Sequence, residues 1–217
     1  MTTLAPWLTS PWLTLALLGV YHGVNPAMGW LFAVSRGLQE QSGRAVALAL
    51  PPIVLGHALS VGATVGLLAA GSAVLSSTTL RVAMAVILIG FGLLKLIRPR
   101  HPRWVGMRLG FRELMLWSFV MATAHGAGLM LLPVFLLGDG GASCEACQAS
   151  MGAVSSSWSR YVSAVALHTG SMFLAAAAIA FIVYFKLGLG LLRKAWFNLD
   201  VGWSLALLAS GAAALWI

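Results

Sequence analysis

Six long runs of apolar residues alternate along the chain with short stretches that contain charged residues or clusters of Gly, Ser and Pro. A helix needs roughly 20 apolar residues to cross the hydrocarbon core of a bilayer. The pattern therefore predicts an all-α, polytopic membrane protein, with residues 1–217 forming one membrane domain. The six predicted transmembrane helices lie near residues 11–34, 46–70, 80–97, 114–137, 159–184 and 199–217.

The composition agrees with a membrane protein. The chain is 60% hydrophobic and 8% charged, whereas about a quarter of the residues of a soluble domain are charged. The net charge of +8 does not indicate nucleic-acid binding, because the basic residues fall in short loops. Residues 1–35 contain no charged side chain. A cleaved signal peptide would begin with a basic region, so we expect the first apolar run to remain as a helix.

The basic residues also predict an orientation. Of the 13 Lys and Arg residues, 11 lie in the first, third and fifth loops, and only Arg81 and Arg160 lie on the opposite side. The positive-inside rule places those three loops in the cytoplasm of a bacterial-type inner (plasma) membrane, with both termini outside. The stretch from about 98 to 112 is the most basic and is the predicted cytoplasmic linker between two halves of the chain.

The two halves, about 9–98 and 113–217, carry their histidines in the same order. A His-Gly pair lies in the first helix of each half, at His22 and His125, and the second helices carry His57 and His168. Because each half has an odd number of spans, the halves enter the membrane from opposite sides. Many secondary transporters are built in this way, with the site at the interface near the midplane. The sequence predicts two inverted three-helix repeats.

The four histidines lie at similar predicted depths. His22 is 14 residues, and His57 and His125 are each 13 residues, from the basic residue at the cytoplasmic end of their span. At 1.5 Å per residue this is roughly 20 Å, near the bilayer centre, and His168 lies somewhat further outward. A single histidine at this depth is explained equally well as a structural residue whose ring is hydrogen-bonded to a neighbouring carbonyl. Four of them, with no Asp or Glu in the core, favour neutral imidazoles that bind a metal ion or a haem.

Several soft or polar donors accompany the histidines. Asn25 and Met28 follow His22 where Pro26 removes a helix hydrogen bond, and Met121 and Met172 lie four residues from a histidine on the same face. Thioether and imidazole together suit Cu(I) or another late first-row metal. The alternative is a plain proline kink and methionines that fill the core. The candidate metal ligands are His22, His57, His125, His168, Asn25, Met28, Met121 and Met172.

Cys144 and Cys147 form a C-x-x-C pair in a loop that the predicted topology places outside the cytoplasm. A disulfide that closes a small loop is the first interpretation in that compartment. Capture of a soft metal at the entrance or exit of the protein is the second, and thiol exchange is the third. Two thiols alone do not form a zinc site, which needs four ligands.

The segment His22-Gly-Val-Asn-Pro-Ala-Met28 resembles the H-x-x-x-P-G-H signature of the nickel/cobalt transporter superfamily. Leu55-Gly-His57-Ala-Leu-Ser-Val61 is similar to the second-helix segment of the same group. The resemblance implies a metal transporter in which His22 is a ligand. Ala27 and Met28 stand where the family has glycine and a second histidine, and the aspartate of the nickel variant is missing. These departures shift the expected metal toward a softer ion.

A secondary transporter for a transition-metal ion is therefore the leading hypothesis, with the bilayer and the ion as partners and with no enzymatic activity. The chain lacks a G-x-x-x-x-G-K-[ST] loop, so it has no ATPase of its own. The alternatives are an electron carrier whose histidines ligate two b-type haems, the membrane subunit of a larger uptake complex, and a thiol-redox protein that uses Cys144 and Cys147. A homo-oligomer is also compatible with the transporter hypothesis.

Overall fold

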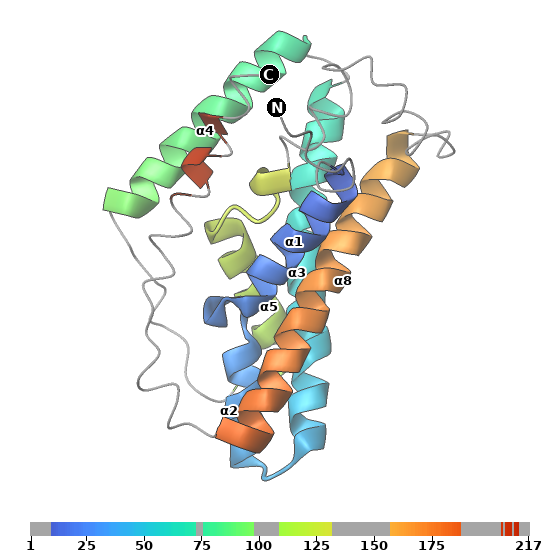
Figure 1. Cartoon of the computed structure of the whole chain (residues 1–217), viewed down its shortest axis with the longest axis vertical. Helices are drawn as coiled ribbons and strands as arrows, with labels where there is room; N and C mark the ends of the chain where they lie inside the picture. The colour runs from blue at the N-terminus through green and yellow to red at the C-terminus, as the bar shows by residue number, and fades with distance from the viewer. Residues whose placement is uncertain are drawn as a thin grey trace, which may run out of the picture.

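Helices make up the regular structure throughout the part of the chain that the computed structural model describes, and no strand occurs there. The described residues are 10–72, 76–97, 109–131 and 157–187, together with the helical pieces 205, 207–209 and 211–212. Figure 1 shows the arrangement of the labelled helices. Their bounds are α1 Pro11–Val24, α2 Trp30–Gln39, α3 Gly43–Ser72, α4 Ser77–Ile97, α5 Phe111–Ala124 and α8 Ser157–Ile182.

Two of these helices are long and apolar enough to cross a membrane. The qualifying segments are Gly43–Gly71 and Ser159–Lys186, each with a mean hydropathy of 1.9. They correspond to the predicted spans 46–70 and 159–184. The third predicted span, 80–97, coincides with α4. Most of the sixth predicted span lies outside the described residues.

The first apolar run is not one continuous helix. Within the predicted span 11–34, α1 ends at Val24 and α2 begins at Trp30, so the helix is interrupted at Pro26, the residue that removes a helix hydrogen bond. Between them lies the 3₁₀ turn η2, Pro26–Met28. Asn25 is extended and its side chain accepts a hydrogen bond of 3.0 Å from the backbone N–H of Ala27, so it caps the new turn. Gly29 adopts a φ of 115°, which a side chain would oppose.

The fourth apolar run also breaks after its histidine. Helix α5 ends at Ala124, and His125 is its C-cap residue. Gly126 takes a φ of 68°, and the 3₁₀ turn η3, Leu129–Leu131, follows. The two 3₁₀ turns have the same position relative to a histidine. Turn η2 covers the fourth to sixth residues after His22, and η3 covers the fourth to sixth residues after His125. Residues 132–137 of this predicted span lie outside the described residues.

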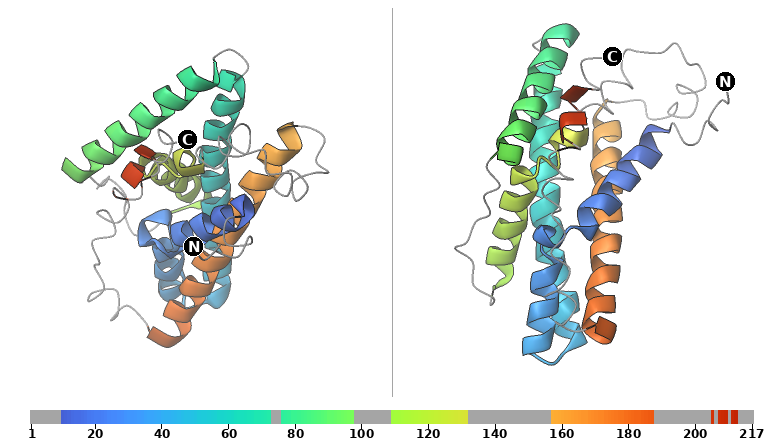
Figure 2. Two further views of the ribbon diagram at one scale, coloured as in Figure 1. Left: turned by 45° about the horizontal axis from the view of Figure 1, so that its top comes forward. Right: turned by 60° about the vertical axis from the view of Figure 1, so that its left-hand side comes forward.

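The helices associate in two main pairs, α1 with α8 and α3 with α5. Both views of Figure 2 place α1 against α8. Glycines permit this approach, because a Cβ on Gly19 would overlap the carbonyl oxygen of His168, and one on Gly23 would overlap that of Met172. In the other pair, a Cβ on Gly56 would overlap the carbonyl oxygen of Met115.

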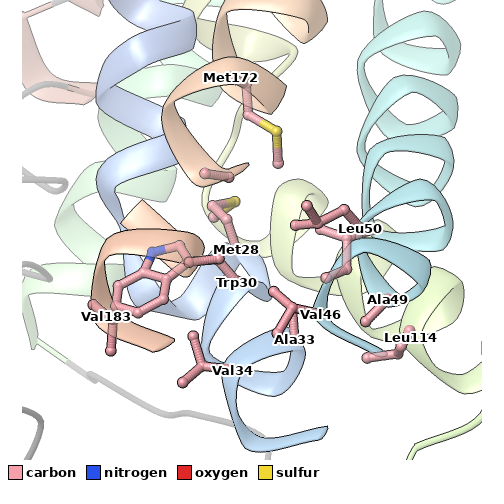
Figure 3. Close-up of a cluster of buried hydrophobic side chains, with 13 residues drawn as sticks. Met28, Trp30, Ala33, Val34, Val46, Ala49, Leu50, Leu114, Met172 and Val183 are labelled. Carbon is pink, nitrogen blue, oxygen red and sulfur yellow. The ribbon is translucent and has the colours of Figure 1, made fainter. Parts of the chain in front are cut away.

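Two apolar clusters form most of the described core. The first cluster lies around α2 and the adjoining parts of α3 and α8 (Figure 3). It contains Met28, Trp30, Ala33, Val34, Val46, Ala49, Leu50, Ile53, Leu114, Met172, Ala176, Ala180 and Val183. The second cluster lies toward the other end of the bundle. It contains Leu15, Val61, Val65, Leu68, Met84, Ala122, Ala127, Leu131 and Ala164.

Candidate functional site: a buried histidine cluster

Three histidines from three helices meet inside the bundle. The ring centroids of His22 and His168 are 4.9 Å apart, those of His57 and His168 are 5.4 Å apart, and those of His22 and His57 are 5.5 Å apart. All three residues have 0% exposure. The sequence positions of these residues are far apart, and helices α1, α3 and α8 bring them together. We call these three residues the histidine cluster.

The histidine cluster lies between the two apolar clusters along each helix. On α1 and η2, His22 falls between Leu15 of the second cluster and Met28 of the first. On α3, His57 likewise falls between Ile53 and Val61. On α8, the same holds for His168, which lies between Ala164 and Met172. Apolar side chains therefore separate the imidazoles from both ends of the bundle.

Backbone carbonyls fix the orientation of two rings in the cluster. His22 Nδ1 lies 2.7 Å from the carbonyl oxygen of Leu18, and His168 Nδ1 lies 3.2 Å from that of Leu15. A carbonyl only accepts, so Nδ1 carries the proton in each ring, and the lone pair of the neutral imidazole is on Nε2. Metal-binding histidines are held in the same way, by a hydrogen bond from the nitrogen that does not bind the metal.

His57 differs from its two neighbours, because neither of its ring nitrogens has a hydrogen-bond partner among the described residues. The same is true of Nε2 of His168. Leaving a buried polar atom without a partner costs about 1–3 kcal/mol. Such a cost is unusual in a natural core and requires an explanation, such as a bound water or ion.

His125 lies on the turn that follows α5 and is 1% exposed. Its Nδ1 lies 2.8 Å from the carbonyl oxygen of Met121, so its lone pair is also on Nε2. The ring contacts described above join His22, His57 and His168.

The other predicted ligands have different surroundings. Asn25 caps η2 through its side-chain oxygen, and the carbonyl of His22 that Pro26 leaves free accepts the N–H of Asn25 at 3.2 Å. Met28 and Met172 pack in the first apolar cluster (Figure 3). Met121 is 1% exposed. Cys144 and Cys147 lie outside the described residues.

The described side chains do not form a finished metal site. No group of three or more His, Cys, Asp or Glu residues within the described ranges is arranged to hold an ion. Instead, His57 and His168 are stacked with 22° between their planes, and His22 meets both rings edge-on. In this structure the cluster brings the imidazoles together without directing their nitrogens at one point.

Two indole groups secure the backbone break beside the cluster. Trp30 Nε1 donates to the carbonyl oxygen of Val24 at 3.2 Å, and Trp117 Nε1 donates to that of Ala27 at 3.3 Å. Neither of these two hydrogen bonds was predicted from the sequence. Pro26 was a signal that carbonyls near the break need new donors, but it does not reveal a donor 90 positions away.

Trp117→Phe is expected to lower the free energy of unfolding by about 1–2 kcal/mol, because it leaves the partly buried Ala27 carbonyl without this donor while it keeps an aromatic ring. Denaturant unfolding in detergent micelles, followed by circular dichroism, measures the change. Trp12→Phe is the matched control, because Trp12 only packs at the edge of the second apolar cluster. An equal effect of both substitutions would contradict the assigned hydrogen bond.

Comparison of the chain with protein-family models, with curated proteins and with solved structures finds no match. The resemblance to the nickel/cobalt transporter superfamily therefore stays a prediction based on residues 22–28 and 55–61.

Proposed function

We propose that the chain is a six-span transporter of the inner (plasma) membrane that carries a transition-metal ion through the histidine cluster. The observation that supports this most is the spacing of the three imidazoles. Rings that bind one ion tetrahedrally at about 2.0–2.1 Å have centroids about 5 Å apart. The observed separations are 4.9, 5.4 and 5.5 Å. The proposal requires the rings to turn from their present orientations, so that three nitrogens face one ion.

The helix pairing supports the proposed inverted repeat. A two-fold axis that exchanges α1 with α5 and α3 with α8 converts the α1–α8 pair into the α5–α3 pair. These two helix pairs have the most extensive contacts in the described structure. The equal positions of η2 and η3 relative to His22 and His125 follow the same symmetry. A site at the interface of such halves is the usual place for a transported substrate.

The apolar clusters fit a transporter in an occluded state. Ionisable groups enclosed within a membrane are costly and mark the path of an ion or proton. Here the first apolar cluster separates the imidazoles from the end that contains Arg36 and Arg44, which the positive-inside rule assigns to the cytoplasm. Rocking of one half against the other would open either side in turn, with both termini outside the cytoplasm.

The packing favours an ion over a haem. A haem between two axial histidines requires space for a macrocycle between their helices. Helix α1 contacts the backbone of α8 at Gly19 and Gly23, on either side of His22. Three imidazole rings also occupy the space between the helices.

The decisive experiment combines elemental analysis, a visible spectrum and ion flux into sealed vesicles. The purified full chain is expected to bind about one Cu(I), Ni(II), Co(II) or Zn(II) ion and to carry it across the bilayer. His22→Ala should lose both properties, whereas His101→Ala, at the histidine that the sequence places in a loop, should keep them. A Soret band in the native protein, or unchanged flux in His22→Ala, would overturn the proposal.

A further inference from the structure

The orientation of two rings determines what the histidine cluster can accept. His22 and His168 each donate Nδ1–H to a backbone carbonyl, at 2.7 and 3.2 Å, so Nε2 of each ring carries a lone pair. Nε2 of His168 is buried without a hydrogen-bond partner among the described residues. A lone pair attracts a cation and repels an anion. The cluster therefore suits a positively charged ligand.

The charge of such a ligand is not offset by any carboxylate in the described part of the chain. The described ranges contain two acidic residues, Glu40 and Glu113, and both are exposed. Glu40 is ion-paired with Arg36 at 2.8 Å, and Glu113 accepts the backbone N–H of Gly110 at 2.6 Å. Glu40 also lines one pocket with Gly110 and Phe111, so both carboxylates belong to the same end of the bundle.

A site with neutral ligands discriminates between ions of different charge. The cost of moving an ion from water into an apolar interior rises with the square of its charge, so a divalent ion costs about four times as much as a monovalent one of equal size. A Zn(II) ion held by three protein ligands also takes a fourth ligand, commonly water. The three rings of the histidine cluster have 0% exposure, and apolar side chains separate them from both ends of the bundle.

Soft donors lie next to the histidine cluster on its cytoplasmic side. Met28 is the first member of the first apolar cluster after His22, and Met172 is the first member after His168 along α8. Both methionines are 0% exposed. Both side chains lie at the same end of the first apolar cluster (Figure 3). Thioether sulfur is an uncharged, soft ligand that favours Cu(I) over harder divalent ions.

We propose that the histidine cluster selects a soft monovalent cation, Cu(I) or its analogue Ag(I), against divalent metal ions. Met28 and Met172 are the next ligands on the path of this ion toward the cytoplasm. The inference rests on the proposed transport function and specifies the charge and the softness of the ion. Neutral imidazoles and thioethers bind such an ion without the carboxylates that a divalent ion would need to offset its charge.

Transport of different ions by the full chain in sealed vesicles tests the selectivity. Ag(I), in chloride-free buffer, is the probe, because it has the charge and the softness of Cu(I) and keeps its oxidation state in the assay. At equal free concentrations, Ag(I) should be carried at least about tenfold faster than Zn(II), Ni(II) or Co(II). Equal or faster transport of a divalent ion overturns the selectivity and leaves the transport proposal in place. A chain that carries none of these ions overturns both.

Substitution of the two methionines tests the path of the ion. The double variant Met28→Leu, Met172→Leu keeps the volume of the core, and it should slow Ag(I) transport at least about tenfold, because alkyl carbon does not bind the ion. The matched control is Met130→Leu, since Met130 is 1% exposed and packs with Leu88 and Leu207, outside the two main apolar clusters. Transport of Ag(I) by the double variant at the rate of the control would overturn the assigned path.

A variant with an added charge tests the physical cause of the selectivity. His57→Glu supplies a carboxylate to the cluster, and it should lower the preference for Ag(I) over Zn(II) at least about tenfold, because the new charge offsets part of the divalent charge. An unchanged preference in a folded variant would overturn the assignment of the selectivity to charge. The comparison of ions with the wild-type chain decides the selectivity itself where this variant fails to fold.

Discussion

Gly23→Ala is expected to lower the free energy of unfolding by about 1–3 kcal/mol, the usual cost of adding an atom to a filled core. The new Cβ would overlap the carbonyl oxygen of Met172, and it would lie 2.8 Å from the Cβ of Ala175. Backbone atoms of α8 cannot move aside singly, so α1 and α8 must separate. Thermal and denaturant unfolding in detergent micelles measure the loss.

Gly90→Ala is the matched control for this prediction. Gly90 also lies within an apolar helix, but a Cβ there meets nothing within 4 Å. Alanine is favoured over glycine within a helix by up to about 1 kcal/mol, so this variant should be neutral or more stable. If the two substitutions change the free energy of unfolding in opposite directions, the loss in Gly23→Ala comes from the α1–α8 contact. If both substitutions leave the free energy of unfolding unchanged or raise it, α1 and α8 are not packed as described.

The long helices could be predicted from the sequence because their signal is local. Span 46–70 was predicted where α3 extends from Gly43 to Ser72, and span 159–184 where α8 extends from Ser157 to Ile182. An uninterrupted apolar run of that length identifies such a helix. The first run shows the limit of this reasoning. Pro26 predicted an interruption after His22, but it did not predict the side-chain cap from Asn25 or the positive φ at Gly29.

The candidate site was predictable only in part. Distances along the helices gave similar depths for His22, His57 and His125, but they do not specify which helices are neighbours. In the structure, His168, which was predicted to lie further outward, contacts the rings of His22 and His57. Gly19 explains part of this difference, because it allows α1 to approach α8 at the backbone of His168. That contact joins residues about 150 positions apart, and hydrophobic periodicity carries no information about it.

His57→Leu is expected to abolish metal binding and to stabilise the metal-free protein. Its two ring nitrogens are buried without hydrogen bonds among the described residues, and an apolar side chain of similar size removes that cost of about 1–3 kcal/mol. At a metal concentration 100 times the wild-type dissociation constant, the wild-type chain gains about 2.7 kcal/mol of stability from the ion. A variant whose affinity is at least about 100-fold weaker gains less than about 0.5 kcal/mol at the same concentration.

Thermal unfolding of both proteins, with and without the metal, measures these two effects separately. His101→Ala is the control for loss of a histidine outside the cluster, and it should keep the full stabilisation by metal. Opposite changes in metal-free stability and metal affinity distinguish a ligand from a packing residue. A His57→Leu chain that lost stability without metal and kept its metal-dependent gain would assign His57 to packing and would remove it from the proposed site.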